Sequence, residues 1–243
     1  MTEGYREDLA YIHDVGFSDF SLKAAPGLLD MLQRSGIRGS LVVDLGCGSG
    51  LWARQIVDAG YSVLGIDMSP SMIAMARRRV PEGCFRRRSL FSADLPGCQA
   101  VTSIGECFNY LFDSNNSWMG LTLVLRRIYK ALRAGGILIF DVAEPGRLPG
   151  RFPVVSHYEG KDWEILVSAS EDKRRSLLTR RITAFRRVGK LYRRTEETHT
   201  LRLYEAGRVA EELRTIGFKV RVLRGYGRLR FGPGHAGFIA RKA

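Results

Sequence analysis

The sequence predicts an α/β protein with a mostly parallel sheet, into which an antiparallel β meander is inserted. Three observations predict this fold class. Apolar, strand-like runs alternate with helical segments between residues 41 and 142. Residues 145–204 break that alternation with long runs in which apolar and polar residues alternate. The last two strands, at 218–226 and 235–242, have no helix between them, so they are expected to form a terminal antiparallel hairpin.

The N-terminal segment 1–40 is expected to be a helical cap, in which Pro26 begins a helix that ends near Gly36. The elements predicted after it are strand 41–45, helix 51–60, strand 61–67, a helix from residue 70, strands 84–91 and 100–106, a helix around 121–132 and strand 137–142. Ser69 and Pro70 form a cap and first-turn pair, and Gly135–Gly136 is expected to stop the helix before the last strand. Such alternation indicates a parallel sheet with helices on both faces.

Residues 145–204 are predicted to form a meander of three strands, at 159–170, 176–188 and 190–204. The apolar positions that suggest a covered face are Trp163, Ile165 and Val167 and, less regularly, Leu178, Ile182 and Phe185. The meander is interpreted as either a lid or a dimer surface. Helix 205–216 resumes the earlier pattern, so 41–144 and 205–243 are expected to form one ligand-binding domain.

Composition indicates a globular protein of 243 residues that is 45% apolar and carries a net charge of +13. No apolar run approaches the ~18 residues that span a bilayer, and the polar N-terminus does not resemble a signal peptide, so we expect a cytoplasmic protein without a membrane partner. The four cysteines lack metal-ligand spacing and are read as reduced thiols, with no metal site. The arginine clusters are scattered over several elements, which favours a solvated surface over nucleic-acid binding.

The segment VVDLGCGSG, residues 42–50, indicates a nucleotide-type ligand. Glycines at alternate positions let the backbone turn sharply and approach a ligand closely. The spacing is GxGxG instead of the GxGxxG that binds a dinucleotide pyrophosphate, and Asp44 would repel a pyrophosphate. Asp67 ends the second strand, where an acid accepts hydrogen bonds from ribose hydroxyls. A simple strand-end cap is the alternative role for Asp67.

Three segments, VVDLGCGSG, VLGIDMSPSMIAMAR and LRAGGILIFDV, resemble motifs of the class I S-adenosylmethionine-dependent methyltransferases over roughly residues 40–142. The resemblance implies a Rossmann-like, seven-stranded sheet with its reversed strand in the terminal hairpin. It also implies S-adenosylmethionine as cofactor and S-adenosylhomocysteine as product. The segments AVTSIGECFNYLF and YREDLAYIHDVGFSDF are similar to those of bacterial enzymes that act on small molecules.

Carried over by position, the resemblance implies a set of cofactor-binding residues. Gly46, Gly48 and Gly50 line the methionine part, with Cys47 filling the turn and Asp44 helping to hold the amino group. Asp67 binds the ribose hydroxyls and Met68 packs on adenine. Where the family has an acid facing the adenine amine, this chain has Ser89 and Leu90, with Asp94 as an alternative. Ile104 and Gly105 end the fourth strand beneath the methyl group.

Methyl transfer from a sulfonium is an in-line displacement that depends mainly on alignment. The predicted catalytic residues are His13, Glu106 and Tyr110, and the other base candidates are Asn109, His157, His199 and His235. Nucleic-acid methyltransferases of this fold carry an (N/D)PP(Y/F) segment after the fourth strand, if they methylate amino groups, or a Pro-Cys pair, if they methylate cytosine C5. Neither motif is present in this chain, which favours a small-molecule acceptor, methylated on N or O. The alternatives are an RNA or protein methyltransferase, or a non-catalytic nucleotide-binding module. A homodimer through the meander is a further expectation.

Overall fold

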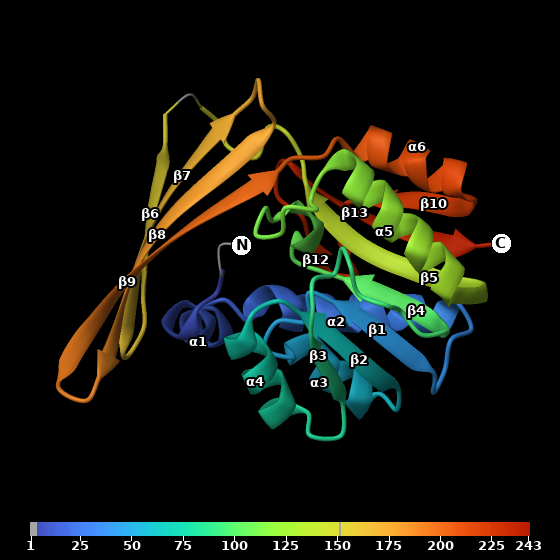
Figure 1. The fold of residues 1–243 in the computed structure, drawn as a ribbon, viewed down its shortest axis with the longest axis horizontal. Coiled ribbons are helices and arrows are strands. Elements are labelled where there is room, and N and C mark those ends of the chain that lie inside the picture. The colour runs from blue at the N-terminus through green and yellow to red at the C-terminus, as the bar shows by residue number, and fades with distance from the viewer. Residues whose placement is uncertain (1–3, 151) are drawn as a thin grey trace.

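The computed structural model describes residues 4–150 and 152–243 and contains two large sheets (Figure 1). One is seven-stranded, with the order β10-β13-β5-β4-β1-β2-β3, and the other is four-stranded, with the order β6-β7-β8-β9. Figure 1 shows the four-stranded sheet standing apart from the larger one, with the N-terminal segment between them. The predicted Rossmann-like α/β fold with an inserted antiparallel meander is confirmed.

The parallel part of the large sheet is built around its first strand. Its strands are β1 (Leu41–Leu45), β2 (Ser62–Asp67), β3 (Cys84–Arg87), β4 (Cys98–Ser103) and β5 (Leu132–Ala143). The intervening helices are α3 (Leu51–Asp58), α4 (Pro70–Arg79), the short η1 (Cys107–Asn109) and α5 (Trp118–Ala131). Asp44 of β1 pairs with Gly65 on one side and Thr102 on the other, so the end of β1 lies at the centre of the sheet.

The chain ends in the predicted antiparallel hairpin. After α6 (Ala206–Ile216), β10 (Phe218–Leu223) pairs antiparallel with β13 (His235–Lys242), and β13 also runs antiparallel to β5. A small two-stranded ribbon, β11 (Gly225–Tyr226) with β12 (Leu229–Arg230), lies in the connection. Because β13 is reversed, His235 at its start lies opposite Ala143 at the carboxyl end of β5.

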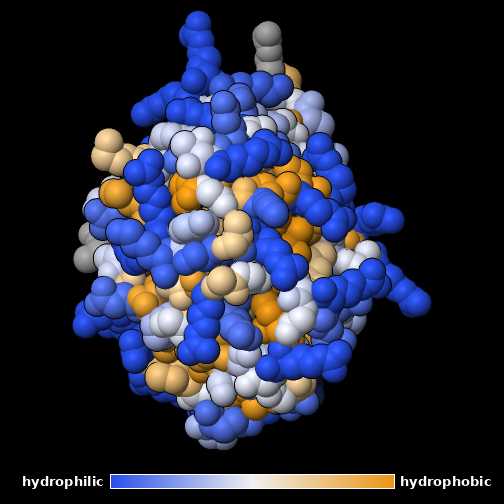
Figure 2. All heavy atoms as spheres, turned by 90° about the vertical axis from the view of Figure 1, so that its right-hand side faces the viewer, coloured by the Kyte–Doolittle hydropathy of each residue, from blue (hydrophilic) through white to orange (hydrophobic). Residues whose placement is uncertain are grey.

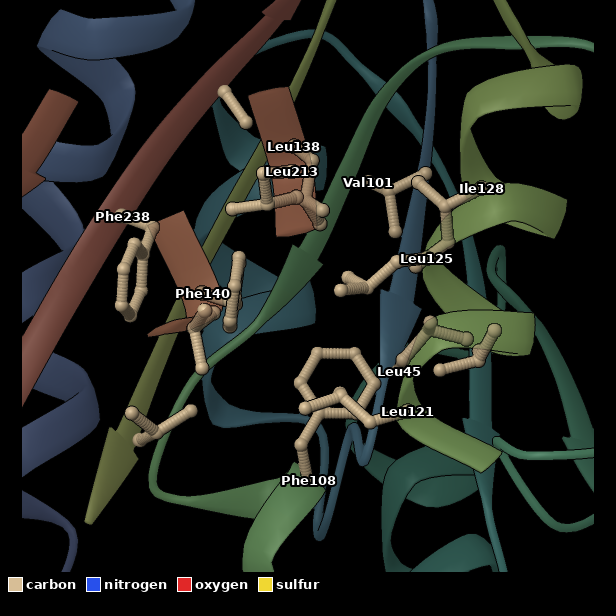
Figure 3. Close-up of a cluster of buried hydrophobic side chains, with 14 of the residues drawn as sticks. Leu45, Val101, Phe108, Leu121, Leu125, Ile128, Leu138, Phe140, Leu213 and Phe238 are labelled. Carbon is tan, nitrogen blue, oxygen red and sulfur yellow. The ribbon is translucent and has the colours of Figure 1, made fainter. Parts of the chain in front are cut away.

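Two hydrophobic cores hold the helices to the faces of the large sheet. Figure 3 shows the core under α5 and α6, whose fully buried members include Phe108, Leu121, Leu125, Phe140, Leu213 and Phe238. The other face carries α2, α3 and α4, with Leu28, Leu32, Trp52, Ile56 and Ile73 in its core. Covering both faces leaves the carboxyl ends of the parallel strands as the open edge of the sheet.

The N-terminal region forms two helices, α1 (Glu7–Gly16) and α2 (Asp19–Arg34), and Pro26 lies inside α2 instead of beginning it. A proline in this position removes one intrahelical hydrogen bond, a loss that packing can offset. The packing here is close, because a Cβ on Gly27 would lie 2.4 Å from the backbone nitrogen of Gly227. The helix therefore rests directly on the backbone of the β11–β12 ribbon.

The helix before β5 ends earlier than predicted. Helix α5 ends at Ala131, and Leu132 already begins β5, so Gly135–Gly136 lie within that strand. The pairing of β4 with β5 shifts register between Cys98 and Ala100, and Gly135 has φ = 74°. The two glycines thus form an irregularity in the strand and do not terminate the helix.

The meander has four strands, one more than predicted: β6 (Val154–Glu159), β7 (Trp163–Asp172), β8 (Leu177–Val188) and β9 (Leu191–Arg202). The missed strand β6 is an edge strand, half-buried or exposed along its whole length, so it lacks a buried apolar face. Phe185 also departs from expectation. On β8 the buried side chains are Leu178, Ile182 and Ala184, which places Phe185 on the opposite face.

Helix α1 joins the meander to the rest of the protein. Leu9 and Ile12 of α1 share a buried cluster with Trp163, Ile165, Ile182 and Ala184 of the meander. At the edge of this cluster the buried Asp8 pairs with Arg193, whose Nε lies 2.6 Å from Oδ2, and with Arg186 at 3.3 Å. The covered face of the meander is therefore packed against the N-terminal helix.

The end of the molecule that lies away from the meander, on the right in Figure 1, presents mostly hydrophilic side chains with apolar ones between them (Figure 2). Within residues 4–150 and 152–243, no helix combines the length and the apolar character that crossing a membrane would require.

Neighbouring residues of β7 provide a test of the meander register. Ile165→Ala is expected to lower the free energy of unfolding by about 2–4 kcal/mol, because Ile165 is 3% exposed and its removal leaves a cavity. Leu166→Ala, the matched control, removes a side chain that is 40% exposed on the other face and is expected to cost less than about 1 kcal/mol. Urea denaturation measures the free energy of unfolding of both variants. Equal losses of this free energy in the two variants would contradict the register.

Candidate active site

A cavity of about 1470 Å³ lies at the carboxyl edge of the parallel strands. Its walls come from three parts of the chain: the strand ends of the large sheet, the N-terminal segment, and the inward face of the meander. Pockets for a single small ligand measure roughly 300–1,000 Å³. The cavity therefore has room for a nucleotide-sized ligand together with a second small molecule.

The glycine turn after β1 forms one end of this cavity. Gly46, Gly48 and Gly50 all have positive φ, at 74°, 53° and 81°, a conformation that side chains disfavour. A Cβ on Gly46 would also lie 2.4 Å from Sγ of Cys107. Cys47 is buried in the turn, and burial holds the pKa of its thiol well above the usual value. Cys47 is therefore a packing residue and not a nucleophile.

The carboxylate of Asp67 holds the glycine turn against the start of α4. Oδ2 accepts a hydrogen bond from the backbone nitrogen of Gly48 at 2.9 Å, and Oδ1 accepts one from Ser69 at 2.8 Å. Burial raises the pKa of Asp67, although these backbone hydrogen bonds act in the opposite direction. Asp67 and Met68 both line the cavity, so acceptor capacity remains available to a ligand there.

Asp44 lies beneath the glycine turn at the end of β1. It is buried, and its Oδ1 accepts a hydrogen bond from Oγ1 of Thr102 at 2.7 Å. Thr102 in turn accepts from the indole nitrogen of Trp52 at 3.1 Å. Burial raises the pKa of Asp44 to about 7. A nearby cation would stabilise the ionised form of this carboxyl group.

The sequence reasoning missed a carboxylate beside Ser89. Ser89 and Leu90 line the cavity, and Oγ of Ser89 hydrogen-bonds to Asp113, which is buried and also lines the cavity. Asp94 is exposed and lies outside the lining. Asp113 comes from the turn before α5, where its Oδ1 accepts from the backbone of Asn115 at 2.8 Å. Only that local turn pattern marks it in the sequence.

The end of β4 forms the floor of the cavity's other half. Ile104, Gly105 and Glu106 line it, and Glu106 adopts a left-handed conformation with φ = 63°. The backbone nitrogens of Gly105 and Glu106 both donate to Oδ1 of the buried Asp141, at 3.1 and 2.7 Å. Such backbone strain persists only where surrounding contacts impose it, and Asp141 supplies those contacts.

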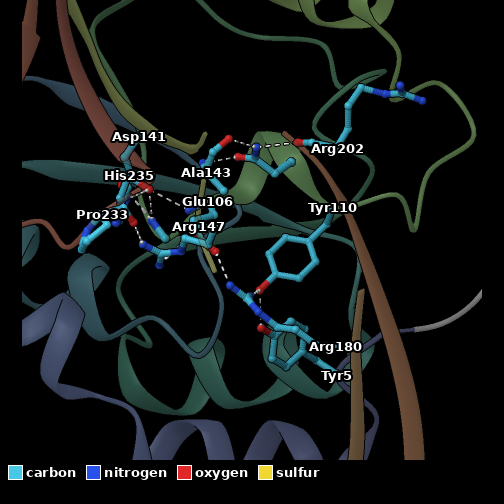
Figure 4. A network of polar contacts seen from close by, with 12 residues as sticks. Tyr5, Glu106, Tyr110, Asp141, Ala143, Arg147, Arg180, Arg202, Pro233 and His235 are labelled. Atoms are coloured by element: carbon cyan, nitrogen blue, oxygen red, sulfur yellow. Dashed lines mark hydrogen bonds and ion pairs between the residues drawn. The ribbon is translucent and has the colours of Figure 1, made fainter. Parts of the chain in front are cut away.

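Glu106 is bound by two arginines from distant parts of the chain (Figure 4). Its Oε2 lies 2.9 Å from Nη2 of Arg180 on β8, and its Oε1 lies 2.7 Å from Nη2 of Arg147 after β5. Burial alone would raise the pKa of Glu106, but Arg180 and Arg147 outweigh it and lower the pKa below its usual value. Glu106 is therefore an ionised, paired carboxylate, which makes it a poor proton acceptor.

The other two predicted catalytic residues lie near the same arginine. Tyr110 Oη lies 2.9 Å from the hydroxyl of Tyr5 and 3.3 Å from Nη1 of Arg180. Burial raises the pKa of Tyr110, so the phenol remains protonated. The ring of His13 lines the cavity 5.0 Å from that of Tyr5 and makes no hydrogen bond with the described residues. Burial lowers the pKa of His13 to about 4, which keeps the imidazole neutral.

The remaining base candidates have structural partners. Asn109 is fully buried and bonds to the backbone of Ala143 and Arg202, at 2.9 and 2.6 Å. His157 pairs with Glu164 and His199 with Glu197, and neither histidine lines the cavity. His235 does line it, with Nε2 2.9 Å from Asp141. In the described part of the chain, no group of three or more His, Cys, Asp or Glu side chains is arranged to hold a metal ion.

Comparisons with known proteins agree with this geometry. Residues 42–136 match the family model described as a methyltransferase domain. The putative methyltransferase YqeM of Bacillus subtilis (strain 168) is 24% identical over 191 residues, which cover 74% of this chain and 73% of that protein.

Two solved structures share the fold over nearly the whole chain. An S-adenosylmethionine-dependent methyltransferase from Clostridium acetobutylicum ATCC 824 superimposes with a TM-score of 0.82 at 16% identity, covering 96% of this chain and 97% of the other. The sugar N-methyltransferase KedS8 from Streptoalloteichus sp ATCC 53650 gives a TM-score of 0.76 at 20% identity, covering 100% and 94%. With the domain match, the glycine turn and the shared sheet, residues 42–136 form a methyltransferase domain, and the whole chain has the fold of S-adenosylmethionine-dependent methyltransferases.

Proposed function

We propose that the protein transfers the methyl group of S-adenosylmethionine to a nitrogen atom of a small molecule bound in the same cavity. One observation carries this proposal: a single cavity joins the glycine turn and Asp67 at one end to His13, Tyr110 and Arg180 at the other. The N-terminal segment and the meander cover it, which suits a small acceptor better than a polymer. The likeness to a sugar N-methyltransferase over the full chain supports nitrogen as the acceptor atom.

At the cofactor end, the proposed roles follow from charge and hydrogen-bonding capacity. Asp67 accepts hydrogen bonds from the ribose hydroxyls, while its bonds to Gly48 and Ser69 fix its position. Asp44, beneath the turn, faces the positive amino group of the methionine part. Asp113, held by Ser89, supplies the carboxylate for the adenine amine that the sequence motif lacked. Met68 and Leu90 pack against the base.

The reaction itself needs alignment more than acid–base chemistry. The nitrogen lone pair forms the new N–CH₃ bond as the S–CH₃ bond breaks, and the bonding pair stays on sulfur to give S-adenosylhomocysteine. The methylated ammonium then releases its proton to water. Proximity and orientation supply the main rate gain in such a step. The amine must enter in its neutral form, and the nearby guanidinium groups disfavour an ammonium there.

The catalytic residues predicted from sequence take more limited roles in this proposal. His13 is neutral, and a pKa of about 4 makes it a hydrogen-bond acceptor for the acceptor's N–H and not a base that would hold its proton. Tyr110 and Tyr5 form a hydroxyl pair that orients polar groups of the acceptor. Glu106 acts electrostatically, through the arginines it holds. The meander serves as the lid, because Ile165, Val167 and Ile182 line the cavity from its inward face.

The first prediction from this proposed function concerns Asp67. Asp67→Asn is expected to weaken S-adenosylhomocysteine binding about 10- to 100-fold, because it loses charge-assisted hydrogen bonds to the ribose. Isothermal titration calorimetry measures this directly. Asp94→Asn is the matched control, since Asp94 is exposed and outside the cavity lining. Wild-type affinity in Asp67→Asn, or an equal loss in Asp94→Asn, would contradict the placement of the ribose.

The second prediction uses the raised pKa of Asp44, about 7 in the free protein. Below that pH the carboxyl is protonated, so binding a ligand ammonium must expel the proton. Affinity for S-adenosylmethionine should therefore fall as pH drops from 7 towards 5.5, by up to about tenfold per unit. Titrations at pH 6.5 in buffers of different ionisation enthalpy should show proton release. Asp44→Asn should bind S-adenosylmethionine more weakly and without proton release. If the wild type also released no proton, Asp44 would not be the group that binds the ligand ammonium.

The third prediction tests the reaction. Purified protein with S-adenosylmethionine should form S-adenosylhomocysteine with members of a panel of aminosugars and amino acids, and not with the matched hydroxyl compounds. With any active amine, His13→Ala should lower kcat about 10-fold at unchanged cofactor affinity, and the loss should be the same from pH 6 to 9, as orientation requires. Turnover of the hydroxyl compounds alone would overturn the choice of nitrogen, and a pH-dependent loss would restore His13 as a base.

A further inference from the structure

The two arginines at the acceptor end carry more charge than the single carboxylate between them. Arg147 and Arg180 each pair with Glu106, at 2.7 and 2.9 Å. The side chains of both arginines are 23% exposed, whereas that of Glu106 is 7% exposed. Two cations and one anion leave this group with a net charge of +1, directed at the cavity that all three line.

Other carboxylates near this group are already engaged. Asp141 is fully buried outside the lining and accepts hydrogen bonds from two backbone nitrogens, from Tyr226 and from His235. Asp19 lines the cavity but is paired with Lys23 at 2.6 Å. Neither Asp141 nor Asp19 forms an ion pair with Arg147 or Arg180, so neither occupies the hydrogen-bond donors of these two arginines.

The guanidinium groups also keep hydrogen-bond donors outside their internal contacts. Arg180 donates from Nη1 to Tyr110 and from Nη2 to Glu106, and Arg147 donates from Nη1 to the carbonyl of Pro233. A guanidinium has five N–H donors in a fork that matches carboxylate and phosphate oxygens. The Nε–H of each arginine makes no hydrogen bond with the described residues. Both arginines can therefore take up an anionic group.

The position of Arg180 is unusual for a charged side chain. On β8 it occupies the inward face between Leu178 and Ile182, which are 1% and 8% exposed. A charge on such a face is costly unless it is paired. Glu106 meets it from a strained backbone that Asp141 holds in place. The inward-facing charge of Arg180 and the strained backbone of Glu106 are both energetically costly, and the two side chains meet at the cavity wall (Figure 4).

We propose that Arg147 and Arg180 bind an anionic group of the methyl acceptor, a carboxylate or a phosphate, while Glu106 keeps the two guanidinium groups aligned when the subsite is empty. This inference rests on the proposed function and deepens it: the substrate is a small amine that also bears an anionic group. Binding that group would fix the amine relative to the methyl, since Gly105 and Glu106 lie at the end of β4 in the same cavity.

The test measures anion binding without any methyl transfer. Protein saturated with S-adenosylhomocysteine, which occupies the cofactor end, is titrated calorimetrically with inorganic phosphate and separately with acetate, at constant ionic strength in chloride. We expect saturable binding of at least one of them, and the stronger ligand identifies the preferred group. Arg180→Gln and Arg147→Gln should each weaken it about 10-fold. Arg180→Lys, which keeps the charge but loses the fork, should fall between.

Two further variants separate binding from a structural role. Glu106→Gln should strengthen anion binding several-fold, because it removes the carboxylate that competes with the anion. If the ion pairs of Glu106 only maintained the structure, Glu106→Gln would weaken anion binding, as the two arginine variants do. Arg181→Gln, the exposed neighbour of Arg180 on the outward face of β8, should leave affinity unchanged. Absence of saturable anion binding in the wild type, or full affinity in both arginine-to-glutamine variants, would overturn the inference. Anion binding without methylation of any amine would count against the proposed function alone.

Discussion

The cavity exists because one short N-terminal segment is held on both sides. Towards the glycine turn, Asp14 on α1 accepts a hydrogen bond from Ser49 at 2.5 Å and pairs with Arg79 at 2.9 Å. Towards the meander, Asp8 pairs with Arg193, and Glu197 accepts the backbone nitrogen of Tyr5 at 2.8 Å. The segment thus connects the glycine turn to the meander, and both line the same cavity. Any movement that opens one end of the cavity must strain contacts at the other, so cofactor and acceptor binding are expected to be coupled.

The distribution of charge along the cavity follows the same division. The buried carboxylates of Asp44 and Asp113 and the half-buried carboxylate of Asp67 lie on the side of the glycine turn, where the bound cofactor would bring an ammonium and a sulfonium. The guanidinium groups of Arg147 and Arg180 lie at the far side, beyond the end of β4. This division of charge is what the proposed reaction requires: a positively charged methyl donor at one end and a neutral nucleophile that bears an anionic group at the other. Electrostatic preorganisation of this kind is strongest where water is excluded, and the inward face of the meander forms part of the cavity wall.

The features of the fold and the site that could be predicted from the sequence are those set by residues close together in the chain. The turn from β1 through Gly46, Gly48 and Gly50 into α3 is local, and so is Asp67 at the end of β2, because each is set by a few consecutive residues. Arg147, Arg180 and Asp113 reach the cavity only through tertiary packing of distant segments, and no short ligand-binding motif marks them; Asp113 has only the local turn pattern. Strand β6 was missed because an edge strand with no buried face has no apolar alternation. Pro26 was misplaced because its packing partner, the β11–β12 ribbon, lies some two hundred residues away in the chain.

Some residues adopt a conformation or an environment that their residue type disfavours. Their positions show which of these departures serve packing and which serve the cavity. Pro26 within α2 and the glycines within β5 are departures that tight packing or a strand irregularity explains, and neither lines the cavity. The left-handed Glu106 and the inward Arg180 are different, since both meet at the cavity wall and each explains the other. A conflict between local preference and the fold is expected where function demands it. Because Asp141 fixes the backbone of Glu106 and β8 fixes Arg180, this ion pair is set by the framework before any ligand enters, which is the condition for precise alignment of a group bound beside it.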